Sequence, residues 1–297
     1  MDGVINLFKP RGMTSHDAVY VIRKIFKTKK VGHTGTLDPN ATGVLPICIG
    51  KATRISEYLL GVDKEYIGEL TLGFSTDTQD SDGVIINSSK KEVTEKEIND
   101  SFNKFKGLIY QIPPMYSALK VDGKKLYELA REGKTIERAP REVNIKESKI
   151  LNNYNNKEII FYTKCSRGTY IRTFCDDIGN DLGTYGYMSY LMRVGVGNFK
   201  IENSISIEAL RNMCERELYS VLTPIDIAIS HMEKINLDSD YYKKIINGAL
   251  VKLDNEYSSL IDLDIRVYCK DKFIGIGKIN QFNNENYLKM NKVFIGE

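Results

Sequence analysis

The sequence predicts an α+β protein in which a mixed, largely antiparallel sheet is flanked by helices and followed by a small C-terminal β domain. Segments of strand and helix character mix along the 297 residues without a regular β-α-β alternation. Hydrophobic residues make up 42% of the chain and charged residues 27%, as in folded globular proteins. After about residue 230 the sequence pattern changes to closely spaced segments of strand character.

The chain is expected to begin with a strand, a helix and a loop-rich segment. VINLF has the composition of a short strand, and Ser15 stands where an N-cap is expected. The helix is predicted over 16–27, since apolar residues recur there at helical spacing. Residues 31–51 hold four glycines and two prolines without a sustained period, so a loop-dominated segment that carries functional residues is expected.

The later elements follow from the same patterns. Thr94 and Glu97 match a capping box, which predicts a helix that begins there and ends near Lys106. Further helices are expected over 124–132, 170–182 and near 239–247, and strands over 65–73, 158–165, 264–270, 273–279 and 287–295. We therefore expect a main domain over residues 1–230 and a small β domain over 235–297.

Composition argues against several classes of protein. The five cysteines are odd in number and never form a C-x-x-C pair, and the three histidines lack metal-ligand spacing, so neither a disulfide framework nor a metal centre is expected. The N-terminus lacks the order of a secretory signal, and no apolar run approaches the ~20 residues that span a bilayer. A soluble, cytoplasmic protein without membrane contact is expected.

Positive charge is concentrated in two stretches. Residues 1–60 hold nine Lys and Arg against four Asp and Glu, and residues 120–141 hold seven against four. This is the pattern of a surface that binds a polyanion. A solvated helix face explains the same charges equally well from charge alone.

Two motif-like segments fail closer tests. GVLPICIGK does not satisfy the phosphate-loop pattern, because Leu45 and Ala52 stand where Gly and Ser or Thr are required. The acidic run Asp77, Asp80 and Asp82 does not fit a calcium loop, so a hydrogen-bonded turn is expected there.

Asp38 is an unusual carboxylate. Glycines at 32 and 35 allow close backbone approach, and Pro39 restricts Asp38 to extended geometry. An Asx-type turn residue is the simplest interpretation. A glycoside hydrolase that pairs Asp38 with a second acid, such as Asp77 or Asp80, is another.

The segment GHTGTLDPNATGVLPICIGKATRISEYLL resembles the catalytic motif of the bacterial tRNA pseudouridine synthase B family, which isomerises uridine-55 in the T loop of tRNA. The resemblance continues in order through DKEYIGELTLGFSTDTQDSDG, QIPPMYSALKVDGKKLYELAREG, SRGTYIRTFCDDIG and YLMRVGVGNF, and covers about residues 3–200. It implies a pseudouridine-synthase-like sheet. KFIGIGKI resembles the family's small PUA-like RNA-binding domain.

The resemblance also implies roles for individual residues. Asp38 matches the catalytic aspartate and Arg172 the arginine paired with it. Tyr66 matches the tyrosine that stacks on the target base, and its position makes it a candidate base for the C5 proton. Tyr170 and Leu191 match further pocket residues.

Two more positions match residues outside the chemistry. His33 matches the histidine that meets the RNA where the uridine leaves its stack. Lys9, with Pro10, matches an N-terminal motif; we include Lys9 among the substrate-binding residues, although structural support is its expected role.

The implied reaction breaks the N1–C1′ bond and forms a C5–C1′ bond without net redox change, so no cofactor is expected. The target base must be flipped out of the T loop, and residues 120–141 are expected to clasp the RNA. The T-arm of tRNA is the expected partner of a monomer that needs no other protein. A non-catalytic RNA-binding protein on the same fold remains the alternative.

Overall fold

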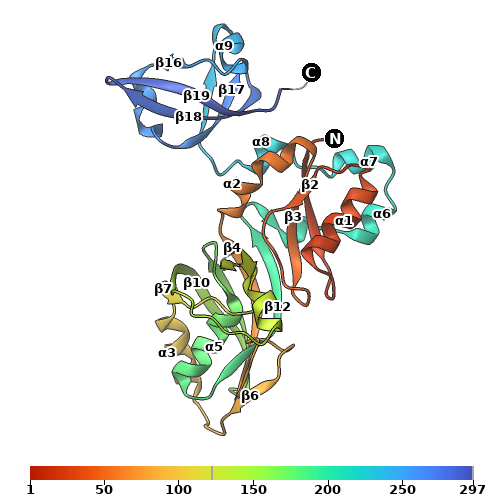
Figure 1. Cartoon of the computed structure of the whole chain (residues 1–297), viewed down its shortest axis with the longest axis vertical. Helices are drawn as coiled ribbons and strands as arrows, with labels where there is room; N and C mark the ends of the chain where they lie inside the picture. Colours follow the sequence, from red (N-terminus) through yellow and green to blue (C-terminus); the bar gives the residue numbers. More distant parts are fainter. Residues whose placement is uncertain (122, 296–297) are drawn as a thin grey trace.

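The computed structural model describes residues 1–121 and 123–295 (Figure 1). A ten-stranded sheet forms the body, in the order β14-β1-β3-β12-β4-β11-β10-β7, with β13 paired to β12 and β2 to β3. Its strands are β1 (Gly3–Lys9), β2 (Val31–His33), β3 (Thr42–Ile49), β4 (Lys64–Leu72), β7 (Gly107–Gln111), β10 (Arg141–Tyr154), β11 (Glu158–Cys165), β12 (Gly186–Val196), β13 (Phe199–Lys200) and β14 (Ile205–Ser206).

Most of the strand pairs in this sheet are antiparallel, while β1 with β14 and β3 with β12 are parallel. The mixed, largely antiparallel sheet predicted from the sequence is therefore confirmed. Two short hairpins lie outside it, β5 (Phe74–Thr76) with β6 (Ile85–Ser88), and β8 (Lys120–Val121) with β9 (Lys124–Lys125).

Helices flank the sheet. Their bounds are α1 (Ser15–Ile25), α2 (Ser56–Leu60), α3 (Glu95–Lys104), α4 (Leu126–Arg131), α5 (Ile171–Leu182), α6 (Ile207–Arg211), α7 (Glu215–Ser220), α8 (Ile225–Ala228) and α9 (Tyr242–Ile246). Helix α1 lies beside β2 near the N-terminus, whereas α3 and α5 pack on the other half of the sheet (Figure 1). Within the described part of the chain, no helix is both long and apolar enough to span a membrane.

The first helix begins one residue earlier than expected. Thr14 is its N-cap: the Thr14 hydroxyl accepts the backbone N–H of Asp17, and the Asp17 carboxylate accepts that of Thr14, each at 3.1 Å. The prediction of Ser15 as the N-cap is wrong, because this reciprocal pair satisfies the free N–H groups one residue earlier. Ser15 is buried, and its hydroxyl accepts the backbone N–H of Leu37.

The expectation of a loop-dominated 31–51 is wrong for most of that segment. It contains β2 and β3, and only residues 34–41 connect them as a loop. From Gly43 to Ile49 the strand β3 is buried, so its sequence reads as a continuous apolar run without alternation. The loop that carries Asp38 is therefore short and anchored at both ends in the sheet.

The C-terminal sheet contains β15 (Lys234–Leu237), β16 (Val251–Leu253), β17 (Asp264–Cys269), β18 (Lys272–Phe282) and β19 (Glu285–Val293), in the order β15-β17-β18-β19-β16. Lys270 and Asp271 have positive φ, 48° and 61°, and form the tight turn between β17 and β18. The predicted small β domain is confirmed. Residues 296 and 297, at its end, lie outside the described residues.

The C-terminal domain packs against the body. Phe294 stacks on Phe273 with ring centroids 5.7 Å apart, and the Arg54 guanidinium lies 5.0 Å from the Phe294 ring. Arg54 Nη1 also donates to the Val293 carbonyl at 2.8 Å. The two parts therefore share an apolar and hydrogen-bonded junction.

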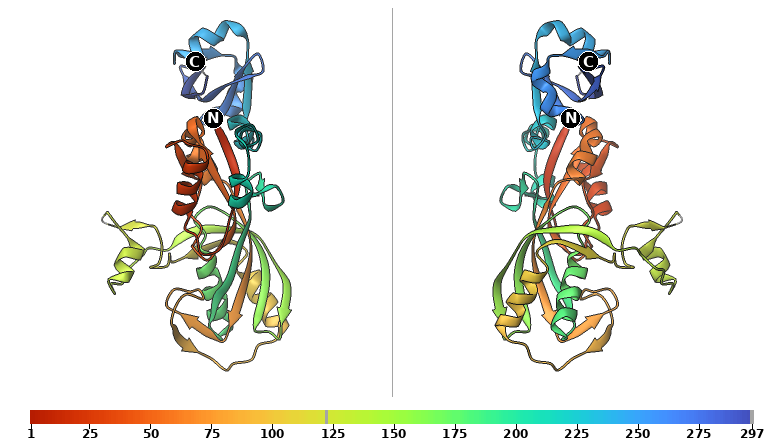
Figure 2. Two further views of the ribbon diagram at one scale, coloured as in Figure 1. Left: turned by 90° about the vertical axis from the view of Figure 1, so that its right-hand side faces the viewer. Right: turned by 90° about the vertical axis from the view of Figure 1, so that its left-hand side faces the viewer.

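The insertion predicted over 120–141 projects from the side of the body (Figure 2). It carries β8, β9 and α4, which lies within the helix expected over 124–132. Residue 122, inside this insertion, lies outside the described residues. A projecting arm of this kind is available to contact a large substrate.

Phe161→Ala is expected to lower the free energy of unfolding by about 3–5 kcal/mol, because a large aromatic side chain leaves a cavity in the core. Phe161 is fully buried, and its ring lies 5.6 Å from Phe102 and 5.7 Å from Phe174. Urea denaturation measures the change. The matched control is Phe282→Ala at a ring that is 58% exposed, where a change within about 0.5 kcal/mol is expected. Equal effects of the two changes would contradict the core assignment.

Candidate active site

Asp38 lies on the loop between β2 and β3, and hydrogen bonds hold the backbone on both sides of it. The Pro39 carbonyl accepts from the Gly12 N–H at 2.9 Å and from Lys9 Nζ at 3.1 Å. The Leu37 N–H donates to the Ser15 hydroxyl at 2.9 Å. The Asp38 side chain remains 41% exposed. A fixed backbone thus presents an accessible carboxylate.

Arg172 lies against this carboxylate from the first turn of α5. Its Nε lies 3.2 Å from Asp38 Oδ2, and the Arg172 side chain is only 8% exposed. The other end of the guanidinium donates to the Tyr116 carbonyl at 2.8 Å and to the Thr78 carbonyl at 3.3 Å. Arg172 therefore joins three separate segments of the chain at the carboxylate.

Asp80 is a second carboxylate on the same guanidinium, with Oδ2 3.2 Å from Arg172 Nη1. Its other oxygen, Oδ1, accepts from the Thr78 hydroxyl at 2.5 Å and from the Asp82 N–H at 3.1 Å. Burial raises the pKa of Asp80, while Thr78 and Arg172 act in the opposite direction. From the sequence, Asp80 was expected in a turn or as the second acid of a hydrolase, and its contact with Arg172 was missed.

The expected hydrogen-bonded turn is present around Asp80. Asp77 Oδ1 accepts the Val84 N–H at 2.8 Å, and the Thr76 hydroxyl donates to the Asp80 carbonyl at 2.7 Å. Asn40 Nδ2 donates to both oxygens of Asp82, which connects this turn to the Asp38 loop. The acidic run thus supports the loop.

Tyr66 and Leu191 lie on the two strands at the centre of the sheet. In the β4–β12 pairing, Tyr66 is opposite Arg193, and Gly68 is opposite Leu191. Directly paired residues share a face, so Tyr66 and Leu191 lie on the same side of the sheet. Burial raises the pKa of Tyr66 to about 12, and its hydroxyl interacts with the Arg193 guanidinium and the Asp38 charge.

Tyr170 and His33 lie at the edges of this group. Tyr170 is the N-cap of α5, and its backbone N–H and carbonyl both hydrogen bond to the Gln111 side chain, at 3.0 and 3.2 Å. His33 ends β2, and its Nδ1 accepts the Gly35 N–H at 3.3 Å. Burial and the Arg193 charge lower the pKa of His33.

Lys9 is buried under the loop. Its side chain is fully buried, and Nζ donates to the carbonyls of Pro10, Met13 and Pro39. In this position the ammonium supports the backbone next to Asp38 and has no surface for a direct contact with a substrate. The geometry therefore favours the structural role over the substrate-binding one.

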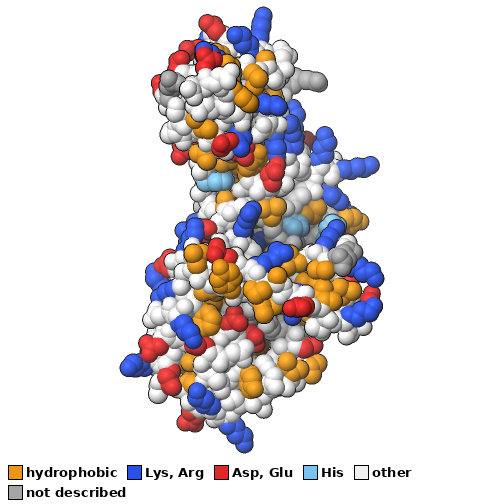
Figure 3. All heavy atoms as spheres, turned by 60° about the vertical axis from the view of Figure 1, so that its left-hand side comes forward, with side chains coloured by type: hydrophobic (Ala, Val, Ile, Leu, Met, Phe, Trp, Pro, Cys, Tyr) orange, Lys and Arg blue, Asp and Glu red, His pale blue; other side chains and the backbone are white. Residues whose placement is uncertain are grey.

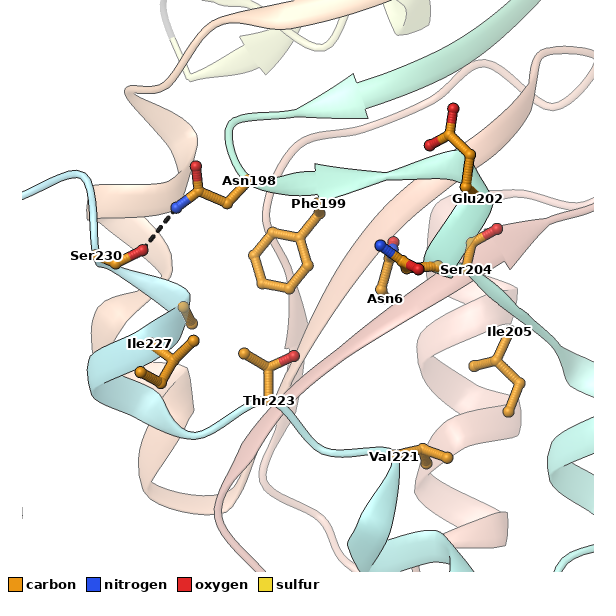
Figure 4. Close-up of a pocket in the computed structure, with 12 residues that line it drawn as sticks. Asn6, Asn198, Phe199, Glu202, Ser204, Ile205, Val221, Thr223, Ile227 and Ser230 are labelled. Carbon is orange, nitrogen blue, oxygen red and sulfur yellow. Dashed lines mark hydrogen bonds between the residues drawn. The ribbon is translucent and has the colours of Figure 1, made fainter.

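A shallow cavity opens beside the carboxylates. Its lining includes Asp38, Asn40, Asp80, Tyr190 and Leu191. A larger cavity of about 550 Å³ lies away from Asp38, between η2 (Ile201–Asn203) and α8 (Figure 4). It holds none of the predicted site residues. Within residues 1–121 and 123–295, no group of three or more His, Cys, Asp or Glu side chains is placed to hold a metal ion.

The basic stretches lie largely at the surface. In 1–60 the exposed Lys and Arg residues are Arg11, Arg23, Lys24, Lys27, Lys29, Lys30 and Arg54. Figure 3 shows Lys and Arg side chains gathered on the body near its junction with the C-terminal domain. These charges form a surface that favours a polyanion.

Two family models match this chain. Residues 23–171 match "TruB family pseudouridylate synthase (N terminal domain)", and residues 172–230 match "tRNA pseudouridylate synthase B C-terminal domain". The chain belongs to the TruB family. It is 46% identical to the tRNA pseudouridine synthase B of Alkaliphilus oremlandii, over 98% of this chain and 97% of that protein. It is 44% identical to that of Clostridioides difficile, over 99% and 100%.

Solved structures support the family assignment at the level of the whole fold. A chain in a Cbf5-Nop10-Gar1 complex superposes with a TM-score of 0.78 at 27% identity, and 99% of this chain and 85% of that chain are covered. A chain in an archaeal box H/ACA Nop10-Cbf5 complex gives 0.74 at 25% identity, over 99% and 86%. The TruB architecture described above, including its C-terminal β domain, is thus shared with solved structures.

Lys9→Met is expected to make stability less dependent on alkaline pH. Burial lowers the pKa of Lys9 from 10.5 to about 8. Between about pH 8 and 10 the unfolded chain keeps a proton on Lys9 that the folded protein releases. The free energy of unfolding of the unmodified protein therefore rises with pH, relative to that of Lys9→Met, by up to about 1.4 kcal/mol per pH unit. Urea titrations of both proteins at pH 7, 8, 9 and 10 measure this difference.

The control for this prediction is Lys24→Met at an exposed lysine of α1, for which a constant difference in stability is expected across the same pH values. If the difference between the unmodified protein and Lys9→Met were also independent of pH, folding would not lower the pKa of Lys9.

Proposed function

We propose that this chain isomerises uridine to pseudouridine at position 55 in the T loop of tRNA. The observation that carries the proposal is the Asp38 carboxylate, accessible to substrate and fixed 3.2 Å from the buried Arg172 guanidinium, in a chain of this family. Relatives 44–46% identical over nearly the whole chain are named tRNA pseudouridine synthase B.

Asp38 is the residue proposed to act at the sugar. A carboxylate can either attack C1′ or remove a proton at C2′, and both routes ease a step in which positive charge develops on the sugar. Arg172 aims this carboxylate, because two of its nitrogens are held by Asp80 and the Tyr116 carbonyl while Nε faces Asp38. No cofactor is needed, because the N1–C1′ bond breaks and a C5–C1′ bond forms, while C5 loses a proton and N1 gains one.

The flipped uridine is proposed to lie between the Asp38 loop and the central strands. Stacking on Tyr66, worth ~1–3 kcal/mol per base, offsets the few kcal/mol that flipping costs. Leu191 provides an apolar wall on the same face of the sheet, and it lines the cavity that Asp38 opens into. Tyr170 adds a further pocket contact, and His33 meets the RNA where the base leaves its stack.

The rest of the T-arm is proposed to bind to the basic surface. The insertion 120–141 clasps the RNA, and residues 235–297 form an accessory RNA-binding domain beside a catalytic domain over 1–230. Phosphate contacts of this kind position the substrate without reading bases. We further propose that the protein acts as a monomer in the cytoplasm, which contains the tRNA of bacteria such as those that supply the named relatives.

Two alternatives are less well supported. A non-catalytic RNA-binding protein does not need an exposed carboxylate held by a buried guanidinium. A glycoside hydrolase could use Asp38 and Asp80, which share one guanidinium. Membership of the TruB family favours the isomerase over both. Release of free uracil would identify the hydrolase, whereas the isomerase keeps the base attached.

Asp38→Asn is expected to lower the single-turnover rate of pseudouridine formation at least about 1000-fold. T-arm binding is expected to persist, because phosphate contacts and stacking do not need this carboxylate. The assay measures tritium release from a T-arm RNA labelled at uridine C5, alongside filter binding. Asp100→Asn is the control, since Asp100 is exposed on α3 and belongs neither to the Asp38 loop nor to the turn at Asp80. Tritium release by Asp38→Asn at the normal rate would exclude this role, and none by the unmodified protein would favour the RNA-binding alternative.

Asp80→Asn is expected to lower the same rate about tenfold or more with little change in T-arm binding. The amide removes one of the two negative charges that orient Arg172, so the guanidinium aims Asp38 less well. Asp77→Asn serves as the control, because Asp77 only closes the turn through the Val84 N–H. Equal rates for these two variants would show that Asp80 acts only in the turn.

A further inference from the structure

Arg193 is a buried guanidinium that the proposed reaction has not used. It lies on β12 and is 1% exposed. Its neighbours across the sheet are Gly43 on β3 and Tyr66 on β4. A Cβ at Gly43 would lie 2.2 Å from the Arg193 carbonyl oxygen, so glycine allows the two strands to approach closely here. Arg193 is thus enclosed between the strand that follows the Asp38 loop and the strand that carries Tyr66.

The guanidinium hydrogen bonds to the Asp38 loop and its following strand. Arg193 Nε donates to the Val44 carbonyl at 2.7 Å, and Nη2 donates to the Gly35 carbonyl at 3.1 Å. Nη1 lies 3.5 Å from the Thr36 carbonyl. The Gly35 and Thr36 carbonyls lie three and two residues before Asp38, at the start of its loop, and the Val44 carbonyl belongs to the residue that directly follows Gly43.

The charge of Arg193 is unusual because no carboxylate neutralises it. Within residues 1–121 and 123–295, no Asp or Glu oxygen lies within 4.0 Å of its nitrogens. Burying a charge without a counter-ion is costly, so an apolar residue of similar volume would suit the core better. The groups that favour the charged guanidinium are the Tyr66 hydroxyl, the Asp38 charge and the Cys165 thiol. Two of these three are proposed to face the substrate.

We propose that Arg193 is a positioning residue for the reaction: it fixes the Asp38 loop relative to Tyr66, so that the carboxylate and the stacking ring meet opposite sides of one nucleoside. This inference rests on the proposed function. Arg193 is buried and touches no substrate. It acts through the loop carbonyls on one side and the Tyr66 hydroxyl on the other, whereas Arg172 acts on the Asp38 carboxylate itself.

Arg193→Lys is the variant that tests this role. Lysine keeps the positive charge but cannot reach the Val44 carbonyl and both loop carbonyls together, because it lacks the planar fork. The protein already holds buried lysines on carbonyls: Lys9 on three, and Lys64 on those of Leu60 and Val62 at 2.6 Å each. A lysine at 193 is therefore compatible with a folded body.

Lys64→Met is the matched control. Lys64 is a buried cation on β4, the strand of Tyr66, but it bonds to the carbonyls of residues 60 and 62 and to no part of the Asp38 loop. The Lys64→Met change therefore removes a buried charge that is bound to carbonyls, but leaves intact the hydrogen bonds that fix the Asp38 loop relative to Tyr66. Full-length proteins are compared by single-turnover tritium release from saturating C5-labelled T-arm RNA, by T-arm dissociation constant and by thermal denaturation.

The expected result is a rate at least about tenfold lower for Arg193→Lys, with a dissociation constant within about threefold of the unmodified protein, and a rate within about threefold for Lys64→Met. Equal loss of rate in both variants would reduce Arg193 to general stability and overturn the proposal, as would a normal rate for Arg193→Lys. Loss of T-arm binding together with unfolding of Arg193→Lys would overturn it too, since the guanidinium would then hold the fold as a whole. An inactive unmodified protein would instead refute the proposed function.

Discussion

The guanidinium of Arg172 is the contact on which the site depends. It brings together the Asp38 loop, the acidic turn at Asp80 and the segment at Tyr116 that leads into the projecting insertion. None of these segments is adjacent to α5 in the sequence; Asp80 lies 92 residues before Arg172. A planar cation with fixed donors on three separate nitrogens can reach partners in three directions at once, whereas a lysine carries all its donors on a single nitrogen.

Backbone carbonyls hold the other buried cations around the site through hydrogen bonds. Lys9, at the end of β1, donates to the Pro39 carbonyl of the Asp38 loop. Arg193, on β12, donates to the Gly35 carbonyl of the same loop and to the Val44 carbonyl of β3. This arrangement holds the loop without placing another carboxylate near Asp38. The two cations thereby fix the loop. Among the described residues, Asp38 and Asp80 are the only acidic partners of the Arg172 guanidinium.

The sequence indicated the fold class and many elements, but strands with irregular register escaped notice. The helix at Thr94 was found because its capping box is local. Strands β10 and β12 were not among the expected elements, since register shifts within each of them break the period of two. Asp38 and Arg172 lie in separate sequence motifs, and only the family resemblance predicted that they form a pair. Arg193 escaped notice because its partners are carbonyls, which leave no signal in the sequence.

The parallel pairing of β3 with β12 has a consequence for how the protein gains its activity during synthesis. The Asp38 loop leaves the ribosome early, yet Arg193 bonds to a carbonyl 158 residues before it, and β12 separates β3 from β4 in the finished sheet. Contacts between such distant residues form late, because a long loop must close first. A nascent chain that ends before β12 therefore carries Asp38 and Tyr66 but lacks the strand that lies between β3 and β4, so a product truncated there lacks Arg193 and the assembled site.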